Sequence, residues 1–434
     1  MKSTGSLASF VLLLAAAVGP GSGPAVRAAD FSAEAAATRT LLRDRVLPYW
    51  YDTGVDWARG GYVLCDDAVK GRCTPDEKQW VTQARMVWGF SHARRHGLDG
   101  GARDYLTAAA QGVKFLQEKM RDPENGGYYW SVALDGAPKD TRKRLYGEAF
   151  VIYALVEYHR VSGDSVALSA AMDLFRVIQS RAHDASHRGW TEHFERNWAP
   201  LPLRHPDAIV EVAGLKSANT HLHLMEALTE LYRETRDPAV RSALEEALEL
   251  NQRYFYPLEA SRAAFHFRPD WTVVTEPGST GLSYGHNVEF AWLMIEAERV
   301  LGRSPSWSHF HNHLEHALRY GTDAVRGGTY NRGMTDQPAT DTNKVWWVQA
   351  EMFPALTYGL QNRPGAAAYS DALAKLILWC QSKQTDPKSG IWMDTVSAEG
   401  APKATGLAHN WKANYHDVRG LMIFCDAYGP VGRK

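Results

Sequence analysis

Apolar residues recur at helical spacing along most of the chain, and the strict alternation typical of half-buried strands is scarce. Two kinds of helical segment alternate. One kind is apolar or small nearly all round, as expected of a buried helix, and begins near Thr82, Tyr146, Ala218, Tyr284, Val345 and Asn414. The other kind has one polar face and covers residues 33–46, 102–120, 166–182, 238–254, 306–320 and 366–383. This alternation predicts an all-α (α/α)6 barrel of six inner and six outer helices.

Short Gly-rich and aromatic segments precede inner helices and repeat along the chain. The sequence Asp-Pro-Glu-Asn-Gly-Gly-Tyr at 122–128 has a counterpart at 386–392, and Gly60-Gly61 has one in Gly327-Gly328. These segments predict short β-hairpins at the end of the barrel where the inner helices begin. Since the inner helices all run in one direction, their N-termini collect at that end and favour developing negative charge. We therefore expect the chemistry at the hairpin end.

The N-terminus resembles a signal peptide. Lys2 precedes a short apolar run at 7–18, and Val26-Arg27-Ala28 resembles a cleavage site of small residues. The run is too short for a comfortable membrane span. We expect residues 1–28 to be removed and residues 29–434 to form a single catalytic barrel domain, periplasmic or secreted, without stable membrane association.

Composition restricts the partners. The chain has 434 residues with 48 Lys and Arg against 49 Asp and Glu, so no basic excess favours nucleic acid. Its 15 Trp and 19 Tyr suit a sugar-binding cleft, although large helical proteins also use such rings for packing.

The four cysteines do not have the spacing of a zinc site. Cys65 and Cys73 flank a short polar loop, and an oxidising compartment would permit a disulfide between them. Cys380 and Cys425 lie in apolar helical stretches and are expected to be buried thiols.

Histidines near the inner-helix starts are candidates for chemistry. His221 and His223 are two residues apart and point in different directions on a helix, so they should not chelate one metal, whereas Asn219 and His223 share a face. A lone histidine is more often a core residue that only forms hydrogen bonds. Further histidines at equivalent helix starts favour function instead.

Two such histidines follow. His286 and Glu289 are three residues apart, so the carboxylate could orient the imidazole or raise its pKa, and His416 shares a face with Arg419.

The repeat adds a pair of opposite charges. Arg85 and Glu351 occupy matching places after Gln-Ala, and Trp347 shares a helix face with Glu351, whereas Trp346 aligns with Trp80. Arg85 could form a structural ion pair, but contact with a sugar oxygen is the favoured role because arginine donates hydrogen bonds without titrating.

Together, the segments 217–223, 285–289 and 344–351, with Arg85, Trp411 and His416, resemble the N-acylglucosamine 2-epimerase family over residues 38–428. That family includes cellobiose 2-epimerases and mannose or other aldose–ketose isomerases. The resemblance implies an (α/α)6 barrel without a catalytic metal or cofactor, acting on a mono- or disaccharide as a monomer or homodimer. The signal peptide and the Cys65–Cys73 loop depart from most members, which are cytoplasmic.

The resemblance also assigns roles to residues. His286 and His416 would be the acid/base pair, His223 and Arg85 would stabilise sugar oxygens, and Glu289 would partner His286. The candidate substrate-binding residues are Asn219, Trp347, Trp411, Glu351, Tyr146 and Arg419.

The expected reaction is proton transfer at the carbon next to the reducing end through a cis-enediol or enediolate, giving an epimer or a ketose. Histidine suits both proton steps because its pKa lies near neutral pH. One alternative is an inverting glycoside hydrolase using two of Glu148, Glu289 and Glu351. Another is an inactive carbohydrate-binding barrel, which would need aromatic rings but not paired proton carriers.

Overall fold

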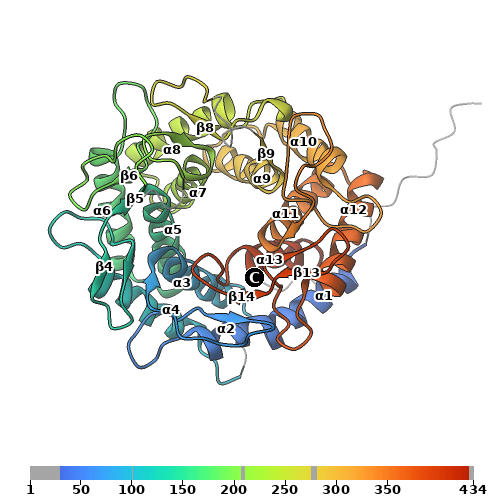
Figure 1. Ribbon diagram of the computed structural model, residues 1–434, viewed down its shortest axis with the longest axis horizontal. Coiled ribbons are helices and arrows are strands. Elements are labelled where there is room, and N and C mark those ends of the chain that lie inside the picture. Colours follow the sequence, from blue (N-terminus) through green and yellow to red (C-terminus); the bar gives the residue numbers. More distant parts are fainter. Residues whose placement is uncertain (1–29, 100, 207–210, 275–280, 430–434) are drawn as a thin grey trace, which may run out of the picture.

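The computed structural model describes residues 30–99, 101–206, 211–274 and 281–429, and these form two concentric rings of helices (Figure 1). The inner ring consists of α3 (Trp80–Arg95), α5 (Leu145–Ser162), α7 (Ala218–Thr235), α9 (Tyr284–Val300), α11 (Trp346–Asn362) and α13 (His416–Tyr428). The outer ring consists of α1 (Ser32–Leu41), α2 (Leu47–Gly54), α4 (Tyr105–Phe115), α6 (Ser165–Arg181), α8 (Pro238–Leu250), α10 (Trp307–His316) and α12 (Ala367–Trp379). The predicted (α/α)6 barrel is confirmed.

Several outer helices end in a wider, π-helical turn. These turns are Leu42–Val46, Leu116–Met120, Asn251–Phe255, Ala317–Gly321 and Cys380–Gln384. In the first repeat the chain continues beyond the predicted boundary at residue 46 into α2, where Leu47 and Trp50 are buried. A short 3₁₀ turn, Ala260–Arg262, follows α8.

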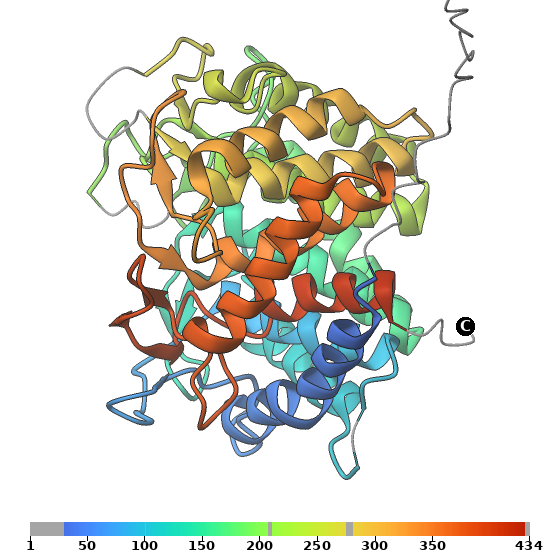
Figure 2. The same ribbon diagram turned by 90° about the vertical axis from the view of Figure 1, so that its right-hand side faces the viewer.

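Short antiparallel strands gather at one end of the barrel, as Figure 2 shows from the side. Two sheets have three strands: β2 (Lys78–Gln79), β3 (Ser131–Val132) and β4 (Pro138–Asp140), and β11 (Lys344–Val345), β12 (Thr395–Val396) and β13 (Pro402–Ala404). The others pair β5 (Lys143–Arg144) with β6 (His193–Phe194), β7 (Lys216–Ser217) with β8 (His266–Phe267), and β9 (Leu282–Ser283) with β10 (Arg332–Gly333). The pairs β3–β4 and β12–β13 are local hairpins of the predicted kind. The other pairs join a strand before an inner helix to a strand that follows the next outer helix.

The repeated Gly-rich motif has a structural explanation. Four lysines each begin the short strand before an inner helix, and the ammonium group of each donates to an aspartate at the start of the preceding loop: Lys78, Lys143, Lys216 and Lys344. In the first loop Gly60 and Gly61 have φ of +83° and +67°, and a Cβ on Gly61 would lie 2.6 Å from Gln83 Oε1. Glycine is therefore needed there.

The first and last repeats meet at a seam. β1 (Asp66–Asp67) pairs with β14 (Gly406–Ala408), and the hydroxyl of Thr405 donates to Asp67 at 2.9 Å. Cys65 and Cys73 form a disulfide that closes the β1 loop, whereas Cys380 and Cys425 are buried thiols as predicted. Among the described residues, no helix is both long enough and apolar enough to span a membrane. The predicted signal peptide lies outside the described residues.

Candidate active site

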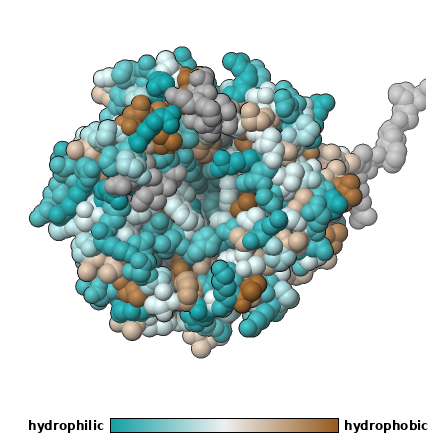
Figure 3. Space-filling view, in the orientation of Figure 1, coloured by the Kyte–Doolittle hydropathy of each residue, from teal (hydrophilic) through white to brown (hydrophobic). Residues whose placement is uncertain are grey.

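A cavity of about 600 Å³ opens at the hairpin end of the barrel, and Figure 3 shows the hollow at the centre of this face. Most of the predicted site residues line it: Arg85, Tyr146, Asn219, His223, His286, Glu289, Trp347, Trp411 and His416. They come from the first two turns of the inner helices, apart from Trp411, which precedes α13. The helix starts therefore bring these residues together as expected.

His416 begins α13 and is anchored from below. Its Nδ1 lies 2.7 Å from Oε1 of Glu351, a carboxylate that also accepts from Trp292 Nε1 at 3.1 Å and Arg419 Nη2 at 2.8 Å. Since Trp292 and Arg419 can only donate, the carboxylate is best satisfied by a proton on Nδ1 of His416. The Nε2 atom of His416 then carries a lone pair.

His286 is held differently from the prediction. Its Nδ1 lies 2.8 Å from the Ser283 hydroxyl and its Nε2 lies 3.3 Å from Asn219 Oδ1. Glu289 instead accepts from Arg419 Nη2 at 2.7 Å. The predicted pairing of Glu289 with His286 is therefore wrong, because Ser283 at the N-cap of α9 competes for the imidazole.

His223 and Arg85 lie on neighbouring parts of the cavity wall. The Nδ1 atom of His223 lies 2.8 Å from Glu226 Oε2. Arg85 donates to the Tyr146 hydroxyl at 2.8 Å and to the Trp411 carbonyl at 3.0 Å, and its buried Nε has no protein partner. His221, by contrast, is buried against the Ser217 carbonyl and the Trp190 amide and does not line the cavity, so it points away from His223 as the helix spacing predicts.

Beneath the histidines, three carboxylates share one guanidinium. Arg419 contacts Glu226, Glu289 and Glu351, all at most 2% exposed. Neither Arg419 nor Glu351 lines the cavity, so their predicted direct contact with substrate is not supported; they support His416 instead. The donor sets that could hold a metal use these same carboxylates, where the positive charge of Arg419 already lies.

The shared guanidinium divides the carboxylates electrostatically. Burial opposes the ionisation of Glu226, but Arg419 and His223 outweigh it and lower the pKa of Glu226 to about 2. Burial, and then the charge of Glu351, raise the pKa of Glu289 well above its usual value. Burial likewise raises the pKa of Glu351, against the opposing effect of Arg419. At neutral pH Glu289 is the carboxyl group of the three best suited to keep its proton.

The cavity histidines are neutral for related reasons. Burial, assisted by His223 and Arg332, lowers the pKa of His286 well below its usual value. Burial, assisted by Arg85 and Arg419, does the same to the pKa of His416. Neutral imidazoles can accept or donate a proton according to their tautomer, which is what transfer at a carbon atom requires.

Aromatic rings complete the cavity. The Trp347 ring centroid lies 4.6 Å from that of His286 and 5.8 Å from that of His416, so this ring contacts both proposed proton carriers. The ring centroid of Trp411 lies 6.5 Å from that of Tyr146. Trp346 also lines the cavity, although helix geometry had favoured Trp347 alone.

Several lining residues were not predicted. They lie in loops and strands above the helix starts and include Glu211, Phe265, His266, Arg332, Met334 and Thr340. Residues in irregular segments follow no helical period, so the hydrophobic pattern contains no signal for them. Glu226 could have been found, because it follows His223 by three residues.

Comparisons with known proteins agree with this site. The model of the family described as N-acylglucosamine 2-epimerase matches residues 60–419. The cellobiose 2-epimerase of Bacteroides fragilis is 31% identical over 392 residues, which cover 87% of this chain and 95% of the relative. The D-mannose isomerase of Thermobifida fusca is 26% identical over 79% of this chain and 83% of the relative.

Solved structures give the same picture. The cellobiose 2-epimerase of Bacillus thermoamylovorans superimposes with a TM-score of 0.81 at 26% identity, covering 91% of this chain and 99% of that chain. A family 76 glycoside hydrolase of Bacteroides thetaiotaomicron shares only the fold, with a TM-score of 0.62 at 10% identity, covering 90% of this chain and 97% of that chain. The predicted reaction class, a carbohydrate epimerase or isomerase, is confirmed, and the chain belongs to the N-acylglucosamine 2-epimerase family.

Proposed function

We propose that the protein is a cofactor-independent 2-epimerase that acts on the reducing-end sugar of a cellobiose-like disaccharide. The observation that carries this proposal is that two buried histidines of one cavity, His286 and His416, both contact the Trp347 ring. The cavity of about 600 Å³ continues from these histidines to Phe265 and to Arg332 of β10, which leaves room for a second sugar ring. Relatives that cover 87% of the chain include cellobiose 2-epimerases.

The proposed reaction begins with ring opening. The lone pair on His416 Nε2 then removes the C2 proton, and the electrons of the C–H bond form an enediolate with the C1 carbonyl. Arg85, His223 and the inner-helix N-termini stabilise its oxygens. His286 returns a proton to the opposite face of C2, which gives the epimer. The two imidazoles regain their starting protonation by exchange with water.

An aldose–ketose isomerase is the second candidate, because returning the proton to C1 gives the ketose from the same enediolate. The similarity to a D-mannose isomerase favours keeping this outcome. A hydrolase is disfavoured because, of the three predicted carboxylates, Glu148 and Glu351 do not line the cavity. The other lining carboxylate, Glu211, has its two oxygens bonded to Asn219 and His266. A simple binding protein would not need two differently anchored histidines.

Incubation with cellobiose, glucose, mannose and N-acetylmannosamine in D₂O tests the proposal. We expect deuterium at C2 of the reducing-end sugar of cellobiose, with formation of the 2-epimer and no cleavage. Exchange confined to the monosaccharides would overturn the disaccharide assignment, and ketose as the main product would favour isomerase. Release of a shorter sugar would favour hydrolysis.

We further propose export, with cleavage after Ala28. The Cys65–Cys73 disulfide supports an oxidising compartment. Mass spectrometry of the protein from the periplasm and medium of a producing cell should give a mature N-terminus near residue 29. If all of the protein stayed in the cytoplasm with Met1 intact, export would be contradicted.

A further inference from the structure

A continuous set of hydrogen bonds reaches His286 from outside the helix that carries it. Asn219, at the start of α7, donates through Nδ2 to Oε1 of Glu211 at 3.0 Å and places its Oδ1 3.3 Å from His286 Nε2. The other oxygen of Glu211 lies 3.0 Å from His266 Nε2. The side chains of Glu211 and His266 are only 10% and 8% exposed, so water competes little for these contacts.

The chemistry of these groups fixes the direction of each bond. A carboxylate can only accept, so the group that Asn219 turns toward Glu211 must be its NH₂. The amide carbonyl of Asn219 then faces His286, and a carbonyl requires that Nε2 of His286 carry the proton. The Nδ1 atom is consequently the acceptor, at 2.8 Å from the Ser283 hydroxyl. Without Glu211, the amide of Asn219 could turn over and present its NH₂ to His286 instead.

The tautomer obtained in this way is opposite to that of His416. Glu351 draws the proton of His416 to Nδ1, whereas the relay through Asn219 draws the proton of His286 to Nε2. We infer that Glu211 is a positioning residue: acting through Asn219, it selects the Nε2–H tautomer of His286 and so makes this imidazole the proton donor. This inference rests on the proposed function, in which His286 returns a proton to the sugar.

The test replaces Glu211 by glutamine, which keeps the size of the side chain but can itself donate to Asn219. The matched control is Glu246→Gln, because Glu246, on the outer helix α8, also bonds a histidine, His183, at 3.0 Å. Selective ¹⁵N labelling of histidine, with His286 assigned from His286→Gln, reports the tautomer directly. The full-length protein is used throughout.

We expect His286 to be protonated at Nε2 in the parent protein and to shift toward the Nδ1–H form in E211Q. We also expect kcat for cellobiose epimerisation to fall about 10–100-fold, with KM changed less than about threefold, as for other losses of a group that orients a histidine. E246Q should retain both the tautomer and kcat.

Two results would overturn the inference. One is an unchanged His286 tautomer in E211Q, and the other is a rise in KM alone, which would mean that Glu211 contacts the sugar directly. Failure of the proposed function is distinguishable, because the parent protein would then show no exchange at C2 while the tautomer could still be read.

Discussion

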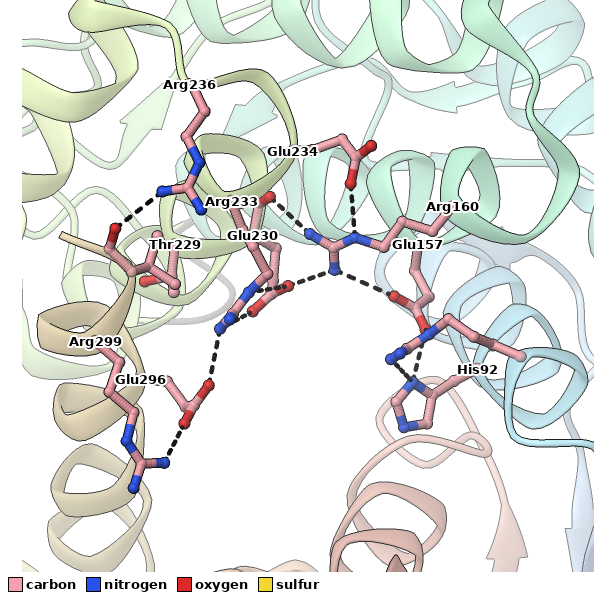
Figure 4. A network of polar contacts seen from close by, with 12 residues as sticks. His92, Glu157, Arg160, Thr229, Glu230, Arg233, Glu234, Arg236, Glu296 and Arg299 are labelled. Carbon is pink, nitrogen blue, oxygen red and sulfur yellow. Dashed lines mark hydrogen bonds and ion pairs between the residues drawn. The ribbon is translucent and has the colours of Figure 1, made fainter. Parts of the chain in front are cut away.

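The two ends of the barrel both contain buried glutamate and arginine side chains, but they differ in how many cationic partners each glutamate has. At the far end, where the inner helices finish, acidic and basic side chains alternate in a network that Figure 4 shows from close by. Glu157 meets His92, Arg95 and Arg160, and Arg160 also contacts Glu230. Farther round the ring, Arg233 and Arg299 both contact Glu296 at 2.8 Å. Each of these carboxylates has at least two cationic or histidine partners.

At the catalytic end, three carboxylates share Arg419. The consequence appears on a single helix: Glu289 and Glu296 are both on α9, seven residues apart. Burial opposes ionisation of both, but Arg233 and other partners lower the pKa of Glu296, whereas the pKa of Glu289 is raised well above its usual value. On this helix, therefore, the carboxylate with two arginine partners favours its charged form, whereas the one that shares its single arginine favours its protonated form.

The largest difference in kcat should be between variants of two buried histidines, one at each end, that each bond a glutamate. His416 bonds Glu351 and His92 bonds Glu157, both at 2.7 Å. We expect His416→Ala to lower kcat about 10²–10⁴-fold, because a positioned acid or base contributes that much, and His92→Ala to leave kcat unchanged. Deuterium exchange at C2 measures both. Full exchange in the His416 variant would refute its role as the base.

Replacing one arginine at each end should lower the free energy of unfolding by different amounts. Arg419→Met leaves three buried carboxylates without a cation, and we expect a loss of about 3–5 kcal/mol in the free energy of unfolding at pH 7. Arg233, with a side chain 35% exposed, is one of several cations in its network, so Arg233→Met should cost about 0.2–1 kcal/mol. Urea unfolding followed by circular dichroism measures both values. Equal losses would contradict the comparison.

The pH dependence of two further variants should have opposite signs. Because the folded-state pKa of Glu289 is raised, the folded protein binds the extra proton, and its stability falls as pH rises above the unfolded-state pKa. Glu289→Gln should therefore be close to the parent in stability at pH 5 and gain relative to it toward pH 9.

Glu296 behaves in the opposite way because its folded-state pKa is lowered. Its contribution is present above the unfolded-state pKa and is lost as pH falls through the folded-state value. Glu296→Gln should cost about 1.5–3 kcal/mol at pH 7, the usual range for hydrogen bonds to a charged group, and less at pH 4. Unfolding free energies across the pH range give both slopes, and slopes of equal sign would show that cation number does not control these groups.

The fold was predictable because many residues in each helix contribute to the hydrophobic pattern. Each inner helix is apolar nearly all round, and the six predicted starts lie within two residues of the observed ones. The site was less predictable because spacing shows which side chains share a face but not which partner each prefers. The same three-residue spacing pairs His223 with Glu226 but fails for His286 and Glu289, where Ser283 and Arg419 compete. Glu211 reaches its partners from a loop, where no period applies.

The smallest effect should come from salt acting on the outermost contacts of the far-end network. The side chain of Arg299 is 42% exposed and bonds Glu296 at 2.8 Å, so Arg299→Gln should cost at most about 1 kcal/mol at low ionic strength. At 1 M salt the screening length shortens to about 3 Å, and we expect the difference between variant and parent to vanish. The buried cluster around Arg419 is shielded from salt, so kcat of the parent should not follow the same dependence. If kcat fell in parallel with the Arg299 contribution, the two ends of the barrel would be electrostatically coupled, and the separation drawn between them would be wrong.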